Sequence, residues 1–420
     1  MIIIIYLFLI TLYVRPQDWV PLIQGLPTHW ILLPLGLLVG FARNPATGTA
    51  LSVPQLKVLL LYIVWIFIST AHGADVSFGI YAFTLFFKRA LVFLFVLLGL
   101  TTGLELQRVL RFMMWLSMFL VFQALLQYTT GESWGGMTRF PGYEEIRVRW
   151  YGDWDGPNVL GLLFTLSAAM SLDRIFGEGK TLMARALGAS YFMASFAGVF
   201  FTNSRGAFLG VLVGLFYFLR SRLRWWQAGL IGAAVLAALV AVGPSRTTEI
   251  SSSESSAGER VWLWEQGLTL LRENPIFGVG RGQFARRVDL GLIAHNNYVQ
   301  NFAETGMVGF LCFIGLLWFS YKPAAIVQDP KNGYSPELQS AARQISTMIV
   351  TYMATTFFVV MENDLLFLLF GLAAALMALA AREQPTRPIL AIKMTDLVFI
   401  GAAAAAIILM VWLAAVKEVV

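Results

Sequence analysis

The chain has 420 residues, of which 58% are hydrophobic and only 13% are charged, and its mean hydropathy is +0.71. An ordinary soluble domain carries about 25% charged residues, so this composition excludes a water-soluble globular protein. The net charge of +6 is compatible with nucleic acid. However, the basic residues lie between apolar segments rather than on one soluble face, so we expect membrane lipids as partners and no nucleic acid.

Apolar stretches recur along the whole chain, many of them close to the roughly 20 residues that a helix needs to cross a bilayer. The first, residues 1–14, has no basic segment before it and no small-residue cleavage site after it, so we interpret it as a retained span rather than a signal peptide. The sequence predicts an all-α, polytopic transmembrane helical bundle of about 12–13 spans. The predicted spans are residues 1–14, 30–42, 56–72, 89–102, 108–128, 157–173, 183–203, 206–220, 226–243, 305–321, 344–361, 364–381 and 394–416.

Two polar insertions divide these spans into groups. The second insertion contains a serine-rich stretch at residues 251–256. Residues 259–272 follow with apolar side chains at near-helical spacing, which predicts an amphipathic helix lying at the outer membrane interface. The expected segments are N-terminal transmembrane helices (1–128), a first outer insertion (129–156), central transmembrane helices (157–243), a large outer loop that ends in a catalytic segment (244–304) and C-terminal transmembrane helices (305–420).

Basic residues set the expected orientation. If the N-terminus is cytoplasmic, the short cytoplasmic connections hold more than half of the lysines and arginines, including Arg220, Arg222 and Arg224 beside a pair of tryptophans. Positive charge beside a span stays on the cytoplasmic side. The outer segments then contain mostly arginine, Arg89 among them, and a planar guanidinium suits bidentate binding of phosphate or carboxylate. For any single arginine, an ion pair with a neighbouring acidic residue is the alternative.

The most specific local pattern is where polar residues enter a predicted span. His295 and Asn296 are followed after nine residues by Gly306, and Gly309 comes after two more. The pattern resembles the bacterial O-antigen ligase and O-antigen polymerase superfamily, whose members carry His, then Asn, Ser or Gln, then nine residues, Gly, two residues and Gly, Thr or Tyr. Two further strings, within residues 202–206 and 260–284, look like segments of the same family. The resemblance covers roughly residues 150–380 and is closest to the ligases.

The resemblance implies a GT-C-like, multi-pass glycosyltransferase of the bacterial inner (cytoplasmic) membrane, with its active site facing the periplasm. The enzyme would move a glycan from undecaprenyl pyrophosphate to a hydroxyl of lipid A-core, with inversion and without metal or cofactor. An O-antigen polymerase or a protein O-oligosaccharyltransferase with the same donor is the alternative. A transporter of lipid-linked sugars is disfavoured because no paired half-repeats are evident, and a non-catalytic scaffold because polar groups converge from separated segments.

Three residues are candidate catalytic groups under this resemblance. His295 is the only histidine beyond residue 72, and imidazole accepts a proton near neutral pH, although a lone histidine more often satisfies local hydrogen bonds. Arg205 is expected at a break between two spans on the outer side, where its charge can meet a lipid phosphate, and snorkelling at the interface is the alternative. Arg281 lies in the glycine-rich stretch 278–282, whose free N–H groups would form a nest for pyrophosphate while its guanidinium clamps that group.

Other residues are expected to bind substrate or to shape the site. Asp153 and Asp155 form an Asp-x-Asp pair of the kind that holds a divalent cation in metal-dependent glycosyltransferases. We expect no metal, because the three histidines are dispersed, and we interpret the pair and Asn158 as helix-capping or sugar-contacting. The polar break at residues 361–364 would orient arginines, contact sugar or form a plain turn. The candidate substrate-binding residues are Arg260, Asn296, Gly280, Gly306, Asn158, Arg147 and Arg149.

Overall fold

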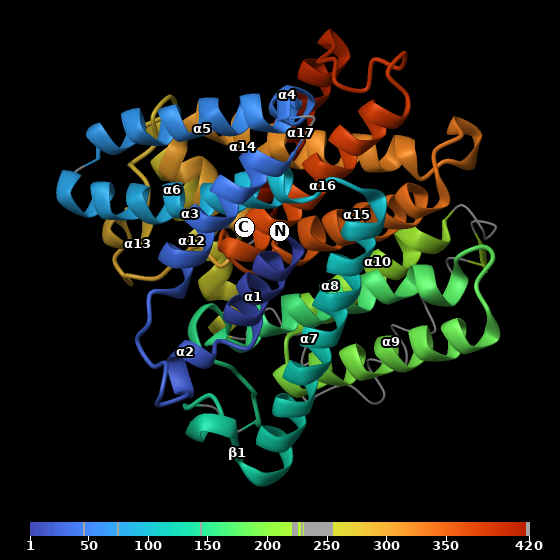
Figure 1. Cartoon of the computed structure of the whole chain (residues 1–420). Helices are drawn as coiled ribbons and strands as arrows, with labels where there is room; N and C mark the ends of the chain where they lie inside the picture. Colours follow the sequence, from blue (N-terminus) through green and yellow to red (C-terminus); the bar gives the residue numbers. More distant parts are fainter. Residues whose placement is uncertain are drawn as a thin grey trace. The chain divides into compact units, whose positions relative to one another are not determined.

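The computed structural model describes residues 1–44, 47–73, 75–142, 145–220, 226–227, 230 and 255–416. This part of the chain is helical almost throughout, and its two short strands, β1 (Glu132–Ser133) and β2 (Met137–Thr138), pair antiparallel. The all-α prediction is confirmed (Figure 1). The other elements are α1 (Ile2–Tyr13), α2 (Pro16–Trp19), α3 (Thr28–Arg43), α4 (Thr47–Leu51), α5 (Pro54–Ala71), α6 (Val76–Gly99), α7 (Gly103–Thr130), η1 (Trp134–Gly136), η2 (Gly152–Trp154), α8 (Pro157–Phe176), α9 (Leu182–Thr202), α10 (Arg205–Leu219), α12 (Ser255–Glu273), α13 (Phe284–Arg287), α14 (Asn297–Val327), η4 (Pro330–Asn332), α15 (Pro336–Thr355), α16 (Asp364–Glu383) and α17 (Met394–Val416).

Eight of the described helices are long and apolar enough to cross a membrane, so the chain is a multi-pass membrane protein. They are α5, α6, α7, α8, α9, α14, α16 and α17, while α1, α3 and α10 are apolar but shorter. On α17 the large side chains of Leu397, Val398 and Leu413 are exposed, as expected for a surface that contacts lipid. Most of the predicted span at residues 226–243 lies outside the described residues, so the full span count stays a prediction.

Helix α6 corrects the predicted span at residues 89–102. It begins at Val76, and both Lys88 and Arg89 lie inside it. The two charges suggested a helix end, but Arg89 Nη1 donates a hydrogen bond to the backbone carbonyl of Glu362 at 2.7 Å. The expectation that Arg89 lies at the outer end of a span is therefore wrong, because it lies inside α6.

Two later spans also differ from the prediction. Helix α14 begins at Asn297, before the predicted start at residue 305, and is interrupted at Gly306. Helix α15 ends at Thr355, whereas the prediction continued to residue 361. The chain leaves the helical path there because its polar groups bond to α14. The carbonyl of Thr356 accepts a hydrogen bond from the backbone N–H of Asn297 at 2.9 Å.

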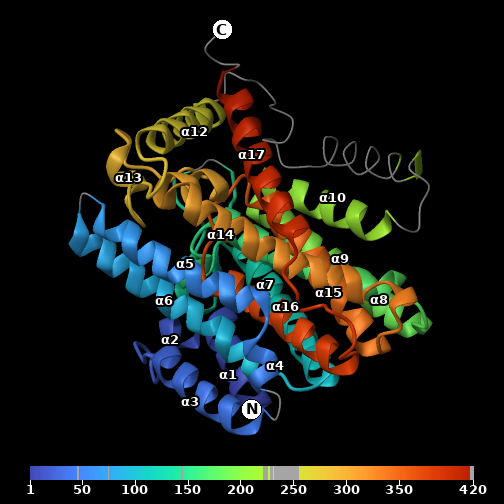
Figure 2. The ribbon, with the colours of Figure 1, turned by 90° about the horizontal axis from the view of Figure 1, so that it is seen from above.

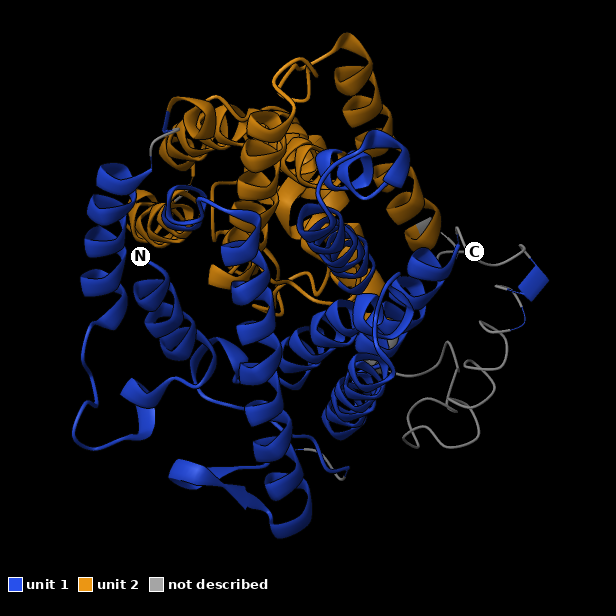
Figure 3. Ribbon diagram, turned by 45° about the vertical axis from the view of Figure 1, so that its right-hand side comes forward, with its two compact units in different colours: residues 1–47, 95–249, 323–355 blue, residues 48–94, 250–322, 356–420 orange. Residues whose placement is uncertain are grey.

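The chain divides into two compact units (Figure 3). Unit 1 contains residues 1–47, 95–249 and 323–355. Its central helix is α8, which is buried along nearly its whole length and packs against α9, α10 and α15. Asp173 near the end of α8 is buried, and its carboxylate receives Arg343 Nε and Ser340 Oγ of α15, each at 2.5 Å. This ion pair ties two helices of the unit together.

Unit 2 contains residues 48–94, 250–322 and 356–420. Helix α16 is its central helix, since all residues from 364 to 381 are buried, as expected for a helix that is apolar on every side. Helices α5 and α6 lie side by side (Figure 2), with ring contacts between Phe67 and Phe83 at 5.3 Å. The helix predicted at residues 259–272 is confirmed as α12, whose Leu263 and Trp264 are buried; residues 251–254 lie outside the described residues.

Candidate functional site

Several separate segments of unit 2 meet at the start of α14. The end of α5 contacts the loop that follows α12, because Ser69 Oγ donates to the carbonyl of Phe277 at 2.6 Å. The segment before α16 contacts the first residue of α14 through the hydrogen bond from Asn297 to Thr356. Polar groups from four places in the sequence are thus collected within one unit.

The glycine-rich stretch 278–282 packs against the backbone of α14. Its first three N–H groups, which the sequence suggested as free donors for a pyrophosphate, are occupied by carbonyls of the protein. The nest prediction is therefore wrong for these donors. The bonds run from Gly278 to Asn274 at 3.0 Å, from Val279 to Ala303 at 2.9 Å and from Gly280 to Glu304 at 3.0 Å.

Gly306 explains how the loop approaches so closely. It adopts φ 66° and ψ −171°, which breaks α14, and a Cβ atom at this position would lie 2.0 Å from the carbonyl oxygen of Ile276. Gly280 has φ 96°, and a Cβ there would lie 3.1 Å from the Cα of Gly73. At both positions, glycine is needed because another backbone segment packs too closely for a Cβ atom. Their contact with a substrate stays a prediction.

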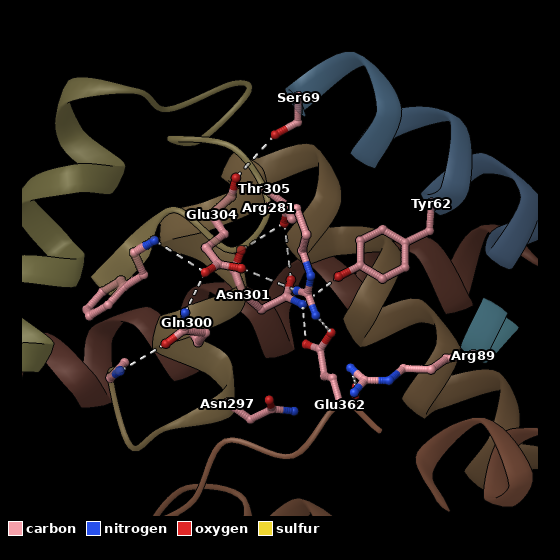
Figure 4. A network of polar contacts seen from close by, with 12 residues as sticks. Tyr62, Ser69, Arg89, Arg281, Asn297, Gln300, Asn301, Glu304, Thr305 and Glu362 are labelled. Carbon is pink, nitrogen blue, oxygen red and sulfur yellow. Dashed lines mark hydrogen bonds and ion pairs between the residues drawn. The ribbon is translucent and has the colours of Figure 1, made fainter. Parts of the chain in front are cut away.

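Arg281 is held between two buried carboxylates (Figure 4). Its Nη2 atom pairs with Glu362 Oε2, and its Nη1 atom lies 3.6 Å from Glu304 Oε2. Burial by itself would lower the pKa of Arg281, but the attraction of Glu362 and Glu304 outweighs burial and raises that pKa above its ordinary value. The guanidinium expected to clamp pyrophosphate is charged and already paired within the protein.

Side chains from α5, α6 and α14 complete this network (Figure 4). Asn301 Nδ2 donates to Glu362 Oε1 at 2.8 Å and to the hydroxyl oxygen of Tyr62 at 2.5 Å. Arg89 holds the backbone carbonyl of Glu362. Arg89 lies thirteen residues after the start of α6, about 20 Å along the helix axis. Ionisable groups so far into a membrane span are costly and usually mark function.

His295 forms the turn directly before α14. Its φ of 50° is left-handed, which is uncommon for a residue other than glycine. The next residue, Asn296, caps the helix, because its Oδ1 accepts the backbone N–H groups of Tyr298 at 2.9 Å and Val299 at 3.2 Å. Burial lowers the pKa of His295, and the charge of Arg260 on α12 lowers it further. The imidazole is therefore neutral at neutral pH and able to accept a proton.

The His295 turn is fixed on its N-terminal side as well. Trp264 Nε1 on α12 donates to the carbonyl of Ala294 at 3.1 Å, and the N–H of Ala294 donates to Gln300 Oε1 at 2.9 Å. Of the residues predicted for the site, unit 2 contains His295, Asn296, Arg260, Arg281, Gly280 and Gly306, and the charge of Arg260 acts on His295.

Arg205 belongs to unit 1 and is the first residue of α10. Asn203 ends α9 in the left-handed conformation with φ 52°, so the predicted break between these two helices is confirmed. Arg205 is half-buried at this break. Its role toward a phosphate stays a prediction.

Three more candidates in unit 1 bond to one another or to their neighbours. Arg147 is buried, and its Nη2 donates to Asn158 Oδ1 at 3.0 Å. Arg149 Nη1 pairs with Asp155 Oδ1 at 2.9 Å. The cap of α8 is Gly156, without a side-chain bond, so Asp153, Asp155 and Asn158 do not cap this helix, and their contact with sugar stays a prediction. Nowhere in the described ranges do three or more His, Cys, Asp or Glu side chains gather as metal ligands.

Sequence reasoning did not single out most of the buried network. A signal was present in the first turns of α14, where Gln300 and Glu304 are four residues apart, as are Asn301 and Thr305. Polar residues at this spacing line one side of a helix and, in a membrane span, predict a polar partner. Glu362 lies in the break at 361–364, and the expectation that this break orients an arginine is confirmed by its pair with Arg281.

Comparison with known families covers the region from α9 into α14. Residues 190–314 match the sequence model of the O-antigen ligase family. The matched region contains Arg205, Arg281 and His295, and it supports the superfamily to which the His295 motif pointed. Among curated proteins, no sequence matches the chain.

Proposed function

We propose, from the premise that this chain belongs to the O-antigen ligase and polymerase superfamily, that it is an O-antigen ligase-type glycosyltransferase. It transfers a glycan from undecaprenyl pyrophosphate to a hydroxyl of lipid A-core at the periplasmic face of the bacterial inner membrane. The observation that carries this proposal is His295, a histidine with a lowered pKa in a fixed turn at the start of α14, within the matched region.

In the proposed reaction, His295 takes the proton from the acceptor hydroxyl while the hydroxyl oxygen attacks the anomeric carbon of the donor. A new carbon–oxygen bond forms as the bond to the pyrophosphate oxygen breaks, and the bonding electrons leave with undecaprenyl pyrophosphate. Attack from the opposite face inverts the anomeric configuration. A positioned general base contributes about 10²–10⁴-fold to such a step. The donor is already activated, so the reaction needs no ATP.

The arginines take different parts in this proposal. Arg260 is close enough to His295 to lower its pKa, and it offers a guanidinium near the place where the leaving group gains charge. We assign Arg281 to positioning rather than to pyrophosphate binding, because Glu304 and Glu362 already neutralise it. Arg205 in α10 is kept as a proposed phosphate ligand.

The test is a transfer assay with purified protein in detergent and EDTA. The donor is an undecaprenyl-pyrophosphate glycan, and the acceptor is lipid A-core. Wild type should form product and His295→Ala should not. The matched control is His29→Gln, which replaces a buried histidine on α3 of unit 1 and should keep its activity.

Other results of the same assay would identify one of the alternative functions. Elongation of the donor glycan without labelling of lipid A-core would move the assignment to a polymerase. Labelling of a Ser/Thr peptide would move it to a protein O-oligosaccharyltransferase. An absence of transfer with every acceptor would contradict an enzyme and favour a transporter.

A further inference from the structure

One glutamine in unit 2 links the His295 turn to the Arg281 ion pairs. Gln300 lies in the first turn of α14 and is buried. Its Oε1 accepts the backbone N–H of Ala294 at 2.9 Å, and its Nε2 donates to Glu304 Oε1 at 2.5 Å (Figure 4). The same Glu304 carboxylate faces Arg281 at 3.6 Å. The side chain therefore bridges the residue before the histidine and the carboxylate that holds the loop.

We propose that Gln300 is a positioning residue, which fixes the backbone of the His295 turn relative to the Glu304–Arg281 pair. The inference deepens the proposed function and rests on it for the catalytic consequence. Gln300 lies outside the motif formed by His295, Asn296, Gly306 and Gly309, and its role follows from its two hydrogen bonds.

The chemistry of the amide explains why glutamine suits this place. One end must accept a hydrogen bond from a backbone N–H, and the other must donate to a carboxylate. A glutamate would bring another carboxylate against Glu304, which already shares one guanidinium with Glu362. An apolar side chain would leave the buried N–H of Ala294 without its acceptor, which is costly in a site shielded from water.

The His295 turn needs such support because its backbone conformation is unfavourable. A left-handed φ at a residue other than glycine persists only where the surroundings fix it. Three side chains do so here. Trp264 holds the carbonyl of Ala294, Gln300 holds its N–H, and Asn296 caps the helix that follows. Of the three, only Gln300 connects the turn with the charged network.

The main test is NMR of protein in which the histidines carry ¹³C at Cε1. The chain has three histidines, and the signal of His295 is assigned by its loss in His295→Asn. Gln300→Met keeps the length of the side chain but removes both hydrogen bonds. It should shift or broaden the His295 signal and leave the signals of His29 and His72 in place.

The matched control is Gln55→Met. Gln55 on α5 is another buried glutamine of unit 2, and its Nε2 donates to the carbonyl of Phe319 at 2.7 Å. Phe319 lies thirteen residues beyond Gly306, about 20 Å further along α14. The control therefore loses a comparable hydrogen bond and should leave the His295 signal unchanged.

A second variant covers the case in which Gln300→Met fails to fold. Gln300→Asn keeps the amide but is one methylene shorter, so it cannot reach Ala294 and Glu304 together. The His295 signal should shift in this variant too. An unchanged His295 signal in either folded variant, or an equal shift in Gln55→Met, would overturn the proposal.

Kinetics connect this placement with the proposed reaction. Misplacement of a catalytic group by about 1 Å costs up to about 100-fold in rate. Gln300→Met should therefore lower kcat by about 10-fold to about 100-fold with the donor KM little changed, and Gln55→Met should lower neither. If wild type transfers no glycan, the proposed function fails, whereas the NMR result still decides whether Gln300 holds the His295 turn.

Discussion

Replacement of Gly306 by alanine is expected to damage the site through the backbone. Its combination of φ 66° and ψ −171° is almost restricted to glycine, and the strain for alanine is about 1–3 kcal/mol. The new Cβ would lie 2.0 Å from the carbonyl oxygen of Ile276 and 2.7 Å from the backbone nitrogen of Gly278. Both are backbone atoms, so the clash is relieved only if the loop that carries Arg281 moves.

Movement of this loop would also weaken its hydrogen bonds to α14. The bonds from Val279 to Ala303 and from Gly280 to Glu304 are worth about 0.5–1.5 kcal/mol each. Together with the strain, the expected loss of stability is about 2–6 kcal/mol.

Gly315→Ala on the same helix is the control for this prediction. A Cβ at Gly315 would lie 3.4 Å from Val58 Cγ1 and 3.7 Å from Ile400 Cδ1, which are ordinary contacts. Its backbone is not left-handed, so alanine should be neutral there or stabilising by up to about 1 kcal/mol.

The only cysteine of the chain provides the assay. Cys312 is buried on α14, so a thiol-reactive dye labels it when the helix bundle unfolds. Gly306→Ala should lower the midpoint of thermal unfolding in detergent by several degrees and abolish transfer, while Gly315→Ala should do neither. If Gly306→Ala unfolds at the wild-type temperature and keeps wild-type activity, the break in α14 and its packing against the loop are refuted.

Three further predictions concern charged and titrating groups. His295→Asn should reduce transfer by about 100-fold to about 10,000-fold without changing the unfolding midpoint; near-normal glycan translocation without transfer would instead identify a transporter. Arg260→Leu removes a charge that lowers the pKa of His295, so that pKa should rise. The proposed base, His295, acts when it is neutral, so the acid limb of kcat/KM against pH should move to higher pH. An unmoved limb would contradict the proximity of the two residues. Arg281→Met should lower the stability of the fold more than Glu362→Gln does. It leaves two buried carboxylates without their cation, whereas Glu362→Gln leaves Arg281 paired with Glu304. Thermal unfolding of both variants measures this order, and the reverse order would contradict the ion-pair arrangement.

The sequence predicted helices well where apolar residues run without interruption. The predicted spans at 157–173 and 364–381 correspond closely to α8 and α16, because hydropathy alone determines such buried helices. It failed at α6, where Lys88 and Arg89 were interpreted as a helix end. Arg89 can stay in the span because it donates a hydrogen bond to the carbonyl of a residue 273 positions later, and local sequence contains no information on such a partner.

In the candidate site, too, the sequence predicted some features and missed others. The motif led to His295, whose neutral state depends on burial and on Arg260, neither of which is visible in the pattern itself. The glycine-rich stretch 278–282 led to a wrong expectation for its N–H groups. Glycine indicates close approach of the backbone, but it does not tell whether the approaching group is a ligand or, as here, the broken backbone of α14 at Gly306.

The buried network and His295 therefore have different roles, the first in the stability of the fold and the second in the proposed chemistry. Backbone that leaves the helical path at membrane depth must have its polar groups satisfied within the protein. Around the break in α14, the backbone N–H groups of Met307 and Gly280 donate to the carbonyls of Pro275 and Glu304. The buried side chains of Arg281, Glu304, Glu362 and Asn301 pair with one another beside it. Their substitution should lower stability first and activity as a consequence. Substitution of His295 removes a proton acceptor at the edge of this network, so activity should fall while the fold persists, and comparison of the two classes of variant separates scaffold from chemistry.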